Sequence, residues 1–173
     1  RARSLRQETG EVVMRRKDKM MERREDLDRV LSTAKYVTVA LCDQGRPYLV
    51  TLSCGYDAGH SCLYFHCAPK GRKIEALERD ASVYGQALVD LGYQQAFCDH
   101  LFETVQFEGT VTFVADHAAK VHALEVMIRQ LEDDPQPVIA EQTKERSVAK
   151  VTIGRIDIRS LSGKRSAKVL VQL

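Results

Sequence analysis

Alternation of apolar and polar residues along most of the chain restricts it to a mainly β fold. Val37, Val39 and Leu41 alternate with polar or small neighbours, "DQGRP" forms a turn, and the alternation resumes from Tyr48 to Cys54. This pattern predicts an antiparallel hairpin, because successive side chains of a strand point to opposite faces. The same pattern predicts strands over 62–66, 83–91, 105–113 and 148–158. We expect a turn over "SLSGKRS" and a short strand at the C-terminus.

Apolar residues at helical spacing interrupt the strands in three places. We expect helices over 25–34, over 72–79, and from an N-cap at Asp116 to a stop before "DDPQP". Consecutive antiparallel strands with few helices favour a small closed barrel, since closure removes exposed strand edges. The expected fold class is therefore mainly β (α+β), with about six antiparallel strands and a few peripheral helices.

Composition excludes several classes of protein. At 173 residues the chain fits one domain, and its net charge of +2 is too small to indicate nucleic-acid binding. No segment reaches the apolar length of a membrane span, and the N-terminal region is too charged for a signal peptide. Five cysteines at scattered positions do not form the pattern of a secreted disulfide framework, so we expect a cytoplasmic protein.

The N-terminal residues differ in composition from the rest of the chain. Residues 1–24 carry many charges of both signs, and "MRRKDKMMERRED" is the densest part. Acidic residues interleave with the basic ones, which disfavours a nucleic-acid-binding arm. We expect residues 1–24 to form a solvated charged arm and residues 25–173 to form a single domain.

The segment "HSCLYFHC" holds four potential zinc ligands, His60, Cys62, His66 and Cys67. A strand would place His66 on the face of Cys62 and Cys67 on the opposite face, so the four side chains would not meet. No paired C-x-x-C motif supports a metal either, and we predict no metal site. The sequence also lacks a G-x-S-x-G motif, so nothing indicates a hydrolase.

The segment "FHCAPKGRKIEALERD" predicts a strand followed by a helix that begins with two cations, Arg72 and Lys73. The N-terminus of a helix carries partial positive charge, so cations there are unfavourable unless an anion binds. Pro69 suits an early helical position and Gly71 lets the backbone approach a ligand, which favours a phosphate site. The alternative is that both cations project into water. Without a bound anion, the pair should slightly destabilise the helix.

Two stretches, "GRPYLVTLSCGYD" and "LYFHCAPKGRKIEALERDASV", resemble the pyridoxamine 5'-phosphate oxidase-like superfamily of flavin-binding split barrels, particularly its nitroimidazole-resistance branch. That branch typically has a G-R-P-Y hairpin, a Y-F-H-S-A-x-x-G-R-K junction and a late T-G-K-R. These motifs correspond to Gly45–Tyr48, Tyr64–Lys73 and Ser162–Arg165. The similarity extends from about Met14 to the C-terminus, and the junction is its most specific part.

The resemblance implies a split β-barrel homodimer that holds FMN at the subunit interface and acts on a small-molecule substrate. The cofactor-binding residues that it implies are Arg46, Val50, Thr51, Ser53, His66, Cys67, Arg72 and Lys73. Arg72 and Lys73 match the grip on the FMN phosphate, residues 50–53 match the strand along the isoalloxazine, and residues 66 and 67 match positions beside the flavin. The chain departs from the branch at Thr51, Ser53, Cys54 and Cys67, where Pro, Asn, Phe and Ser are usual.

The resemblance indicates a flavin-dependent oxidoreductase that passes hydride or electrons to a small acceptor, for which a nitroaromatic compound is one candidate. His66 is then either the catalytic residue that delivers a proton or a structural histidine. An alternative function is a haem-binding or redox-sensing barrel, with His66 as axial ligand near Cys54, Cys62 and Cys67. A third reading is a structural dimer without cofactor, which the departures from the branch would permit.

Overall fold

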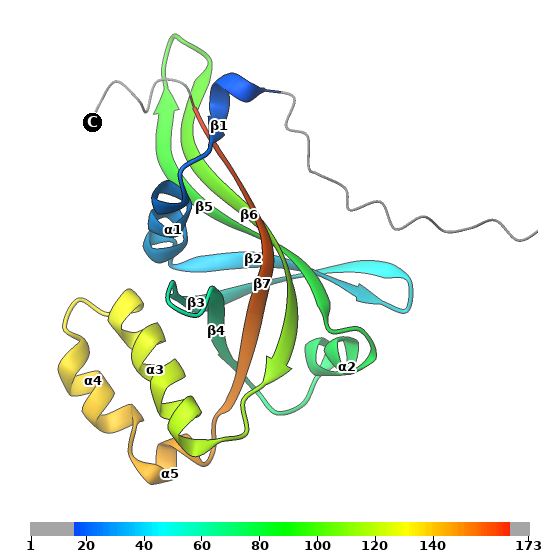
Figure 1. Ribbon diagram of the computed structural model, residues 1–173, viewed down its shortest axis with the longest axis vertical. Helices are drawn as coiled ribbons and strands as arrows, with labels where there is room; N and C mark the ends of the chain where they lie inside the picture. Colours follow the sequence, from blue (N-terminus) through cyan, green and yellow to red (C-terminus); the bar gives the residue numbers. More distant parts are fainter. Residues whose placement is uncertain (1–15, 167–173) are drawn as a thin grey trace, which may run out of the picture.

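Residues 16–166 are described in the computed structural model, and their strands form one antiparallel sheet that closes into a split barrel (Figure 1). The strands are β1 (Met20–Met21), β2 (Tyr36–Asp43), β3 (Arg46–Asp57), β4 (Cys62–Cys67), β5 (Ser82–Gln94), β6 (Asp99–Phe113) and β7 (Thr152–Arg165). Their order is β1-β7-β4-β3-β2-β5-β6, and β7 also pairs with β6. The six long strands therefore form a closed ring, as the alternation predicts.

The β2–β3 hairpin is confirmed down to its turn. Gln44 and Gly45 occupy the two turn positions with φ of 52° and 77°. This left-handed backbone is what two-residue hairpin turns require, and glycine adopts it without strain. The turn sets the register of the whole hairpin, in which Asp43 lies opposite Arg46.

The last strand differs from its prediction at both ends. Val148 belongs to a short helix, whereas β7 begins at Thr152 and continues through "SLSGKR" to Arg165. The segment is a strand rather than a turn because it pairs with β6, from Glu108–Ser160 to Glu103–Arg165. The expected C-terminal strand lies outside the described residues.

The helices are α1 (Arg24–Thr33), α2 (Arg72–Arg79), α3 (His117–Leu131), α4 (Pro135–Gln142) and α5 (Glu145–Val148), with a 3₁₀ turn η1 at Lys17–Lys19. The first three confirm the predictions, and Asp116 caps α3 by accepting a hydrogen bond from the Ala119 N–H at 2.8 Å. α4 and α5 depart from the prediction, because "DDPQP" ends one helix while Pro135 also suits the first position of the next. No helix within residues 16–166 is long and apolar enough to cross a membrane.

Residues 16–24 lie closer to the barrel than a solvated arm would. β1 pairs with β7 through Met20–Lys164 and Met21–Gly163, and the side chain of Met21 is buried. Arg24 is already the first residue of α1. The described part of the charged segment is therefore attached to the barrel along β7.

Alternation along the strands produces two hydrophobic cores, one on each face of the sheet. Leu63 and Phe65 of β4 point into the barrel interior, where they join the larger core. Cys62 and Tyr64 point outward into a second core, where α3, α4 and α5 cover β4 and β7 (Figure 1). The opposite orientation of neighbouring β4 residues follows from the period-2 pattern.

α1 is held in the interior core by apolar burial and by one ion pair. Its Leu27, Val30 and Leu31 are buried. Glu103 of β6 is only 2% exposed, and its carboxylate accepts two hydrogen bonds from Arg29, at 2.7 and 2.8 Å. The bidentate pair satisfies a carboxylate that would otherwise be costly to bury.

α3 packs against β3 at very short range, because β3 has no side chain at Gly55. A Cβ atom at Gly55 would lie 2.5 Å from the Cα atom of Met127. Hydrogen bonds fix the same contact: the Tyr56 N–H donates to the Gln130 side chain at 2.7 Å, which in turn donates to the Ala34 carbonyl at 2.8 Å. The position of α3 on the outer face therefore depends on Gly55.

We predict that Gly55→Ala destabilises the protein by at least about 1–3 kcal/mol, because the added methyl group meets helix backbone rather than a flexible side chain. Urea unfolding followed by circular dichroism measures the change. Gly59→Ala in the following turn is the matched control, since its Cβ would lie 3.4 Å from the Asp57 Oδ1 atom, an ordinary van der Waals contact, and would meet no backbone. The control should change the free energy of unfolding by no more than about 0.5 kcal/mol. Equal effects of the two substitutions would contradict the proposed contact.

Candidate functional site

Val50, Thr51 and Ser53 of β3 lie on opposite sides of the barrel wall. Val50 packs against the interior core, whereas Thr51 and Ser53 point outward and are exposed. Within residues 16–166, neither of these hydroxyl groups has a side-chain hydrogen-bond partner. Thr51 and Ser53 are therefore available to a ligand on the outer face, and Val50 can offer only its backbone there.

His66 and Cys67 end β4 and also point to opposite faces, as predicted. His66 is exposed on the outer face, and Cys67 is half-buried against the interior core. The pairing of β3 with β4 stops at Cys54–Phe65, one residue before Ser53 and His66. Ser53 and His66 are thus neighbours at the point where the two strands separate.

The helix after β4 begins with an open N-terminus. Its N-cap, Gly71, has a φ of +128°, a conformation that favours glycine, and no side chain caps the first turn. The expected place of Pro69 in that first turn is wrong, because Pro69 lies in the loop before the N-cap. Uncapped N–H groups at a helix start are an arrangement that binds anions.

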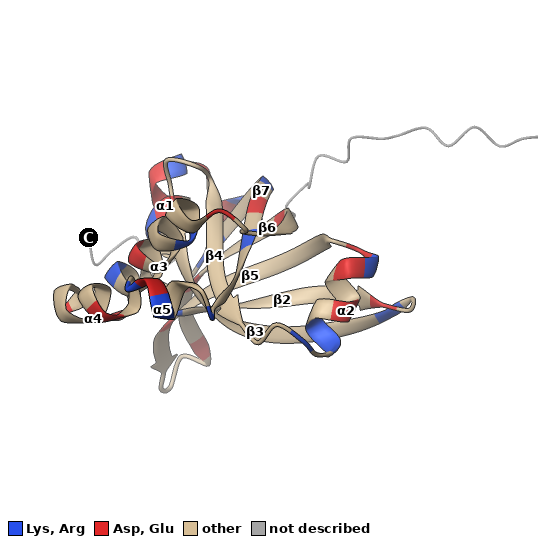
Figure 2. Cartoon of the chain, turned by 90° about the horizontal axis from the view of Figure 1, so that it is seen from below, with Lys and Arg blue, Asp and Glu red and all other residues tan. Residues whose placement is uncertain are grey.

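Arg72 is already paired with a carboxylate of the protein, and this pairing was not predicted from the sequence. Its Nε atom donates to the Asp43 carboxylate at 2.8 Å, and its guanidinium lies 4.1 Å from the centre of the Tyr48 ring. Arg79, at the other end of α2, donates to the same carboxylate at 2.6 Å. These hydrogen bonds, first the one from Arg72, hold the pKa of Asp43 below its usual range. Figure 2 shows the basic residues at both ends of α2.

Lys73 is not neutralised in this way. Its ammonium group lies 5.4 Å from the centre of the Phe65 ring, and no carboxylate of the described residues pairs with it. Burial raises the pKa of the Cys54 thiol to about 12, and the nearby charge of Lys73 opposes this rise. The pKa of Cys67 is also raised by burial and lowered in part by Lys73. The charge of Lys73 therefore lies near Phe65 and Cys67 of β4 and near Cys54 of β3. The charge of Arg72 is instead paired with Asp43 of the β2–β3 hairpin.

The predicted residues lie at the β2–β3 hairpin, at the start of α2, and on β3 and β4 near the point where those two strands separate. Arg46 is exposed at the start of β3, opposite Asp43. Arg72 and Lys73 contact different partners, since Arg72 pairs with Asp43 of the hairpin and Lys73 lies over the Phe65 ring. Reasoning from the sequence missed Asp43 and Tyr48 as partners of Arg72, although both lie within or beside the "DQGRPY" turn.

An uncovered apolar row lies beside Thr51 on the outer face. Leu49 of β3 and Tyr84 of β5 both pair with Ala40 of β2, so these three residues form a row across three strands, here called the outer row. Leu49 is 64% exposed and Tyr84 is 39% exposed. These exposures mean that, within the described residues, no helix covers the side chains of Leu49 and Tyr84 in the outer row.

The closed barrel and its strand-to-helix junction define the class of split β-barrel proteins. The family model described as pyridoxamine 5'-phosphate oxidase matches residues 23–165, and the chain belongs to this family. The family resemblance of the sequence is thereby confirmed. A comparison with curated proteins gave no match.

Solved structures share this fold. A protein from Bacteroides thetaiotaomicron described as a 5-nitroimidazole antibiotic resistance protein is 27% identical, with a TM-score of 0.70 over 84% of this chain and 86% of that chain. The flavocytochrome Anf3 from Azotobacter vinelandii is 17% identical, with a TM-score of 0.70 over 89% and 72% of the two chains. The FAD and heme binding protein from Mycobacterium smegmatis is 21% identical, with a TM-score of 0.69 over 86% and 73%. The first supports the nitroimidazole-resistance branch, and the other two support the fold.

We predict that the cysteines react with iodoacetamide in the order of their exposure and pKa. Cys42 and Cys98 are exposed and should be modified first at pH 8, Cys67 more slowly, and Cys54 hardly at all. The thiolate is the nucleophile, and a pKa of about 12 leaves only about one Cys54 thiol in ten thousand ionised at that pH. Peptide mapping by mass spectrometry measures each rate. All five cysteines should react in guanidinium chloride, whereas rapid native labelling of Cys54 would show that the barrel core is open.

Proposed function

We propose that the protein binds FMN and is a flavin-dependent oxidoreductase that passes hydride or electrons to a small acceptor, such as a nitroaromatic compound. The observation that carries this proposal is the ammonium group of Lys73 beside the uncapped first turn of α2. A cation without a carboxylate partner in the described chain, next to free N–H groups, is suited to a phosphate.

The phosphate end of FMN fits the start of α2. Gly71 has no side chain, and a Cβ atom there would meet nothing within 4 Å, so the backbone is open to a bound group. Arg72 uses its Nε atom for Asp43, which leaves its terminal nitrogens for phosphate oxygens. Cys67, where the branch usually has serine, provides only a weak donor. The phosphate contact is therefore assigned to Lys73, Arg72 and the helix N–H groups.

The ring end of FMN is assigned to the outer face of β3 and β4. Thr51 and Ser53 present hydroxyl groups without side-chain partners in the described chain, and His66 lies next to Ser53. FMN, when bound, supplies the hydride or electron transfer, and these residues orient it. The exposed imidazole of His66 is assigned the delivery of a proton to the reacting centre, since an imidazole ring can both donate and accept a proton.

A homodimer is part of the proposal, because one chain leaves the assigned ring site open on one side. The outer row and the exposed Tyr36 on the same face are apolar surface of the kind that subunits bury. A second copy packed there would cover Thr51 and enclose the flavin at the interface.

All five cysteines are free, which supports the assigned location in the reducing cytoplasm.

The names of similar structures support a flavin or haem cofactor. One is described as an FAD and heme binding protein and another as a flavocytochrome. A haem-binding function with His66 as axial ligand is therefore the second candidate, favoured by the exposure of His66. The structure separates the cysteines that would accompany it, since Cys54 lies in the interior core and Cys62 in the outer one. An absorbance spectrum of protein purified without added cofactor distinguishes flavin, haem and empty protein.

We predict that the double variant Arg72→Ala/Lys73→Ala weakens FMN binding by at least about a hundredfold. Each charge-assisted hydrogen bond contributes about 1.5–3 kcal/mol, and every 1.4 kcal/mol is about tenfold in affinity. Riboflavin lacks the phosphate, so its weaker affinity should hardly change. Fluorescence titration of both ligands against both proteins measures the difference.

Arg79→Ala is the matched control for this experiment. Arg79 binds the same Asp43 carboxylate but lies in the last turn of α2, so its removal should leave FMN affinity within a few-fold of wild type. Equal losses of FMN and riboflavin in the double variant would mean that the two cations support the fold. An equal loss in Arg79→Ala would mean that the Asp43 network, rather than the phosphate, controls binding.

We predict that Leu49→Asp in the outer row converts the homodimer to a monomer and lowers its flavin content. A carboxylate at the centre of an apolar interface would be buried without a partner. Light scattering after size-exclusion chromatography measures the mass. Ala118→Asp adds the same charge to an exposed position of α3 and should leave the dimer intact. A wild-type monomer that retains flavin would refute the interface.

A further inference from the structure

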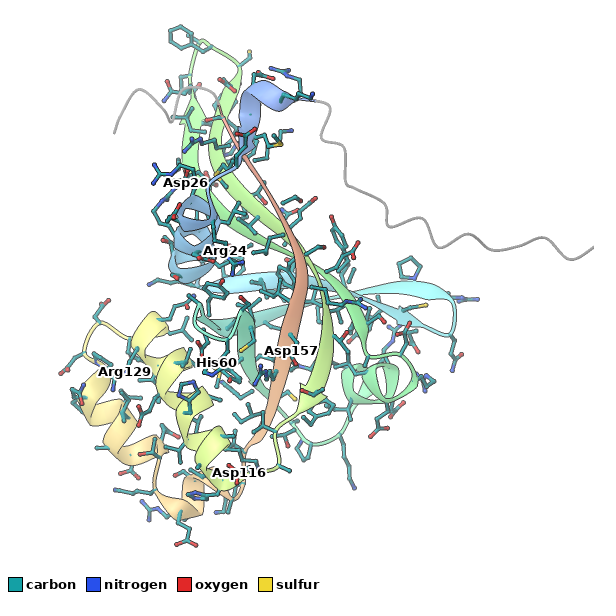
Figure 3. All side chains as sticks on the ribbon, viewed as in Figure 1. Arg24, Asp26, His60, Asp116, Arg129 and Asp157 are labelled. Atoms are coloured by element: carbon teal, nitrogen blue, oxygen red, sulfur yellow. The ribbon has the colours of Figure 1, made fainter. Side chains whose placement is uncertain are left out.

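Three potential metal ligands from separate elements meet on the outer side of the β3–β4 turn. Asp57 ends β3, His60 lies in the turn, and His122 lies on α3. The Asp57 Oδ2 atom is 2.9 Å from His60 Nδ1 and 2.7 Å from His122 Nε2. All three ligand atoms lie within 4.8 Å of one another, and Figure 3 shows His60 beside α3.

Surrounding contacts hold these side chains in place. The Asp57 side chain is only 10% exposed, and its Oδ1 atom accepts a hydrogen bond from the His60 N–H at 3.1 Å. The His122 ring stands edge-on to Tyr64, with ring centres 5.9 Å apart. Nearby Arg24 donates to the turn at Ser61, but its charge is paired with Asp28. The carboxylate oxygen and the two imidazole nitrogens are therefore oriented before any ligand binds.

The separations are slightly shorter than those around a small tetrahedral ion. Zinc binds imidazole nitrogen and carboxylate oxygen at about 2.0–2.2 Å, and tetrahedral angles then separate the ligand atoms by about 3.4 Å. The two nitrogen–oxygen distances of 2.9 and 2.7 Å would need to lengthen by roughly 0.5–0.7 Å. His60 lies in a turn and is 61% exposed, and His122 is 49% exposed, so this adjustment needs only side-chain movement.

We propose that Asp57, His60 and His122 bind a zinc ion. Each neutral imidazole has a tautomer whose lone pair faces the shared oxygen, and imidazole with carboxylate is a ligand set that zinc accepts. His60 is 61% exposed and His122 is 49% exposed, so water reaches the remaining coordination position. The bound ion joins α3 to the β3–β4 turn.

This site is separate from the one assigned to FMN. It lies at the Cys62 end of β4, whereas His66 and the start of α2 lie at the opposite end of that strand. The prediction of no metal site rested only on the four potential ligands within "HSCLYFHC". His60 does not combine with Cys62, His66 or Cys67; its partners are Asp57 and a residue 62 positions away on α3.

Isothermal titration with zinc chloride tests the proposal. The background is the full chain with Cys42→Ser and Cys98→Ser, which removes the exposed thiols that could also bind zinc. We expect one ion per chain in this background and a rise in its thermal unfolding midpoint, because an ion that binds only the folded state stabilises it. His60→Gln and His122→Gln should each weaken binding by at least about tenfold, the loss that even outer-shell partners of metal ligands cause.

His100→Gln is the matched control, because His100 is equally exposed and pairs with Asp90 on a different hairpin. Its zinc affinity should equal that of the background. The proposal is overturned if the background shows no binding with a Kd of about 1 mM or tighter. It is also overturned if His100→Gln loses as much affinity as His122→Gln. Because the readout is metal binding, a failure of the flavin proposal leaves this test unaffected.

Discussion

Closure of the barrel by β7 is the constraint on which the rest of the structure depends. β7 pairs with β4 through its first half and with β6 along most of its length, so it joins the two ends of the sheet. Once the ring is closed, every strand has an interior and an exterior face, and period-2 alternation assigns each side chain to one of them. The interior core, the buried face of α1 that packs against it and the Arg29–Glu103 pair then form one unit.

The same closure decides where ligands can bind. Buried side chains form the interior core, so a bound cofactor of the proposed kind would lie on the outer face or at a strand end. α3, α4 and α5 cover the outer face over β4 and β7, and α3 also packs closely on β3 at Gly55. Beyond it, Thr51, Ser53 and the outer row remain open. The open surface on β3 therefore lies between the β2–β3 turn and Gly55.

Local signals in the sequence were sufficient for much of this arrangement. The turn at Gln44 and Gly45, the β4–α2 junction and the cap at Asp116 each depend on a few consecutive residues, and all three are confirmed. Pairings between distant residues were not predictable in this way. Asp43 meets Arg72 and Asp57 meets His122 only because the barrel brings their strands and helices together. Proline positions were a second source of error, because a proline indicates a helix boundary but can lie either inside the helix or outside it. Pro135 begins α4, whereas Pro69 lies in the loop before α2.

The ion pair of Arg72 with Asp43 reduces the cost of placing a cation at a helix N-terminus. Two cations there would oppose the partial charge of the helix if both faced water. Arg72 instead shares Asp43 with Arg79, and the pKa of that carboxyl is lowered. A depressed folded-state pKa means that Asp43 contributes stability above its unfolded pKa and loses it as pH falls through the folded value. Asp43 thus offsets the cost of Arg72 at neutral pH. The unfavourable charge that remains at the helix start is that of Lys73. A bound phosphate would therefore stabilise the helix most at this residue.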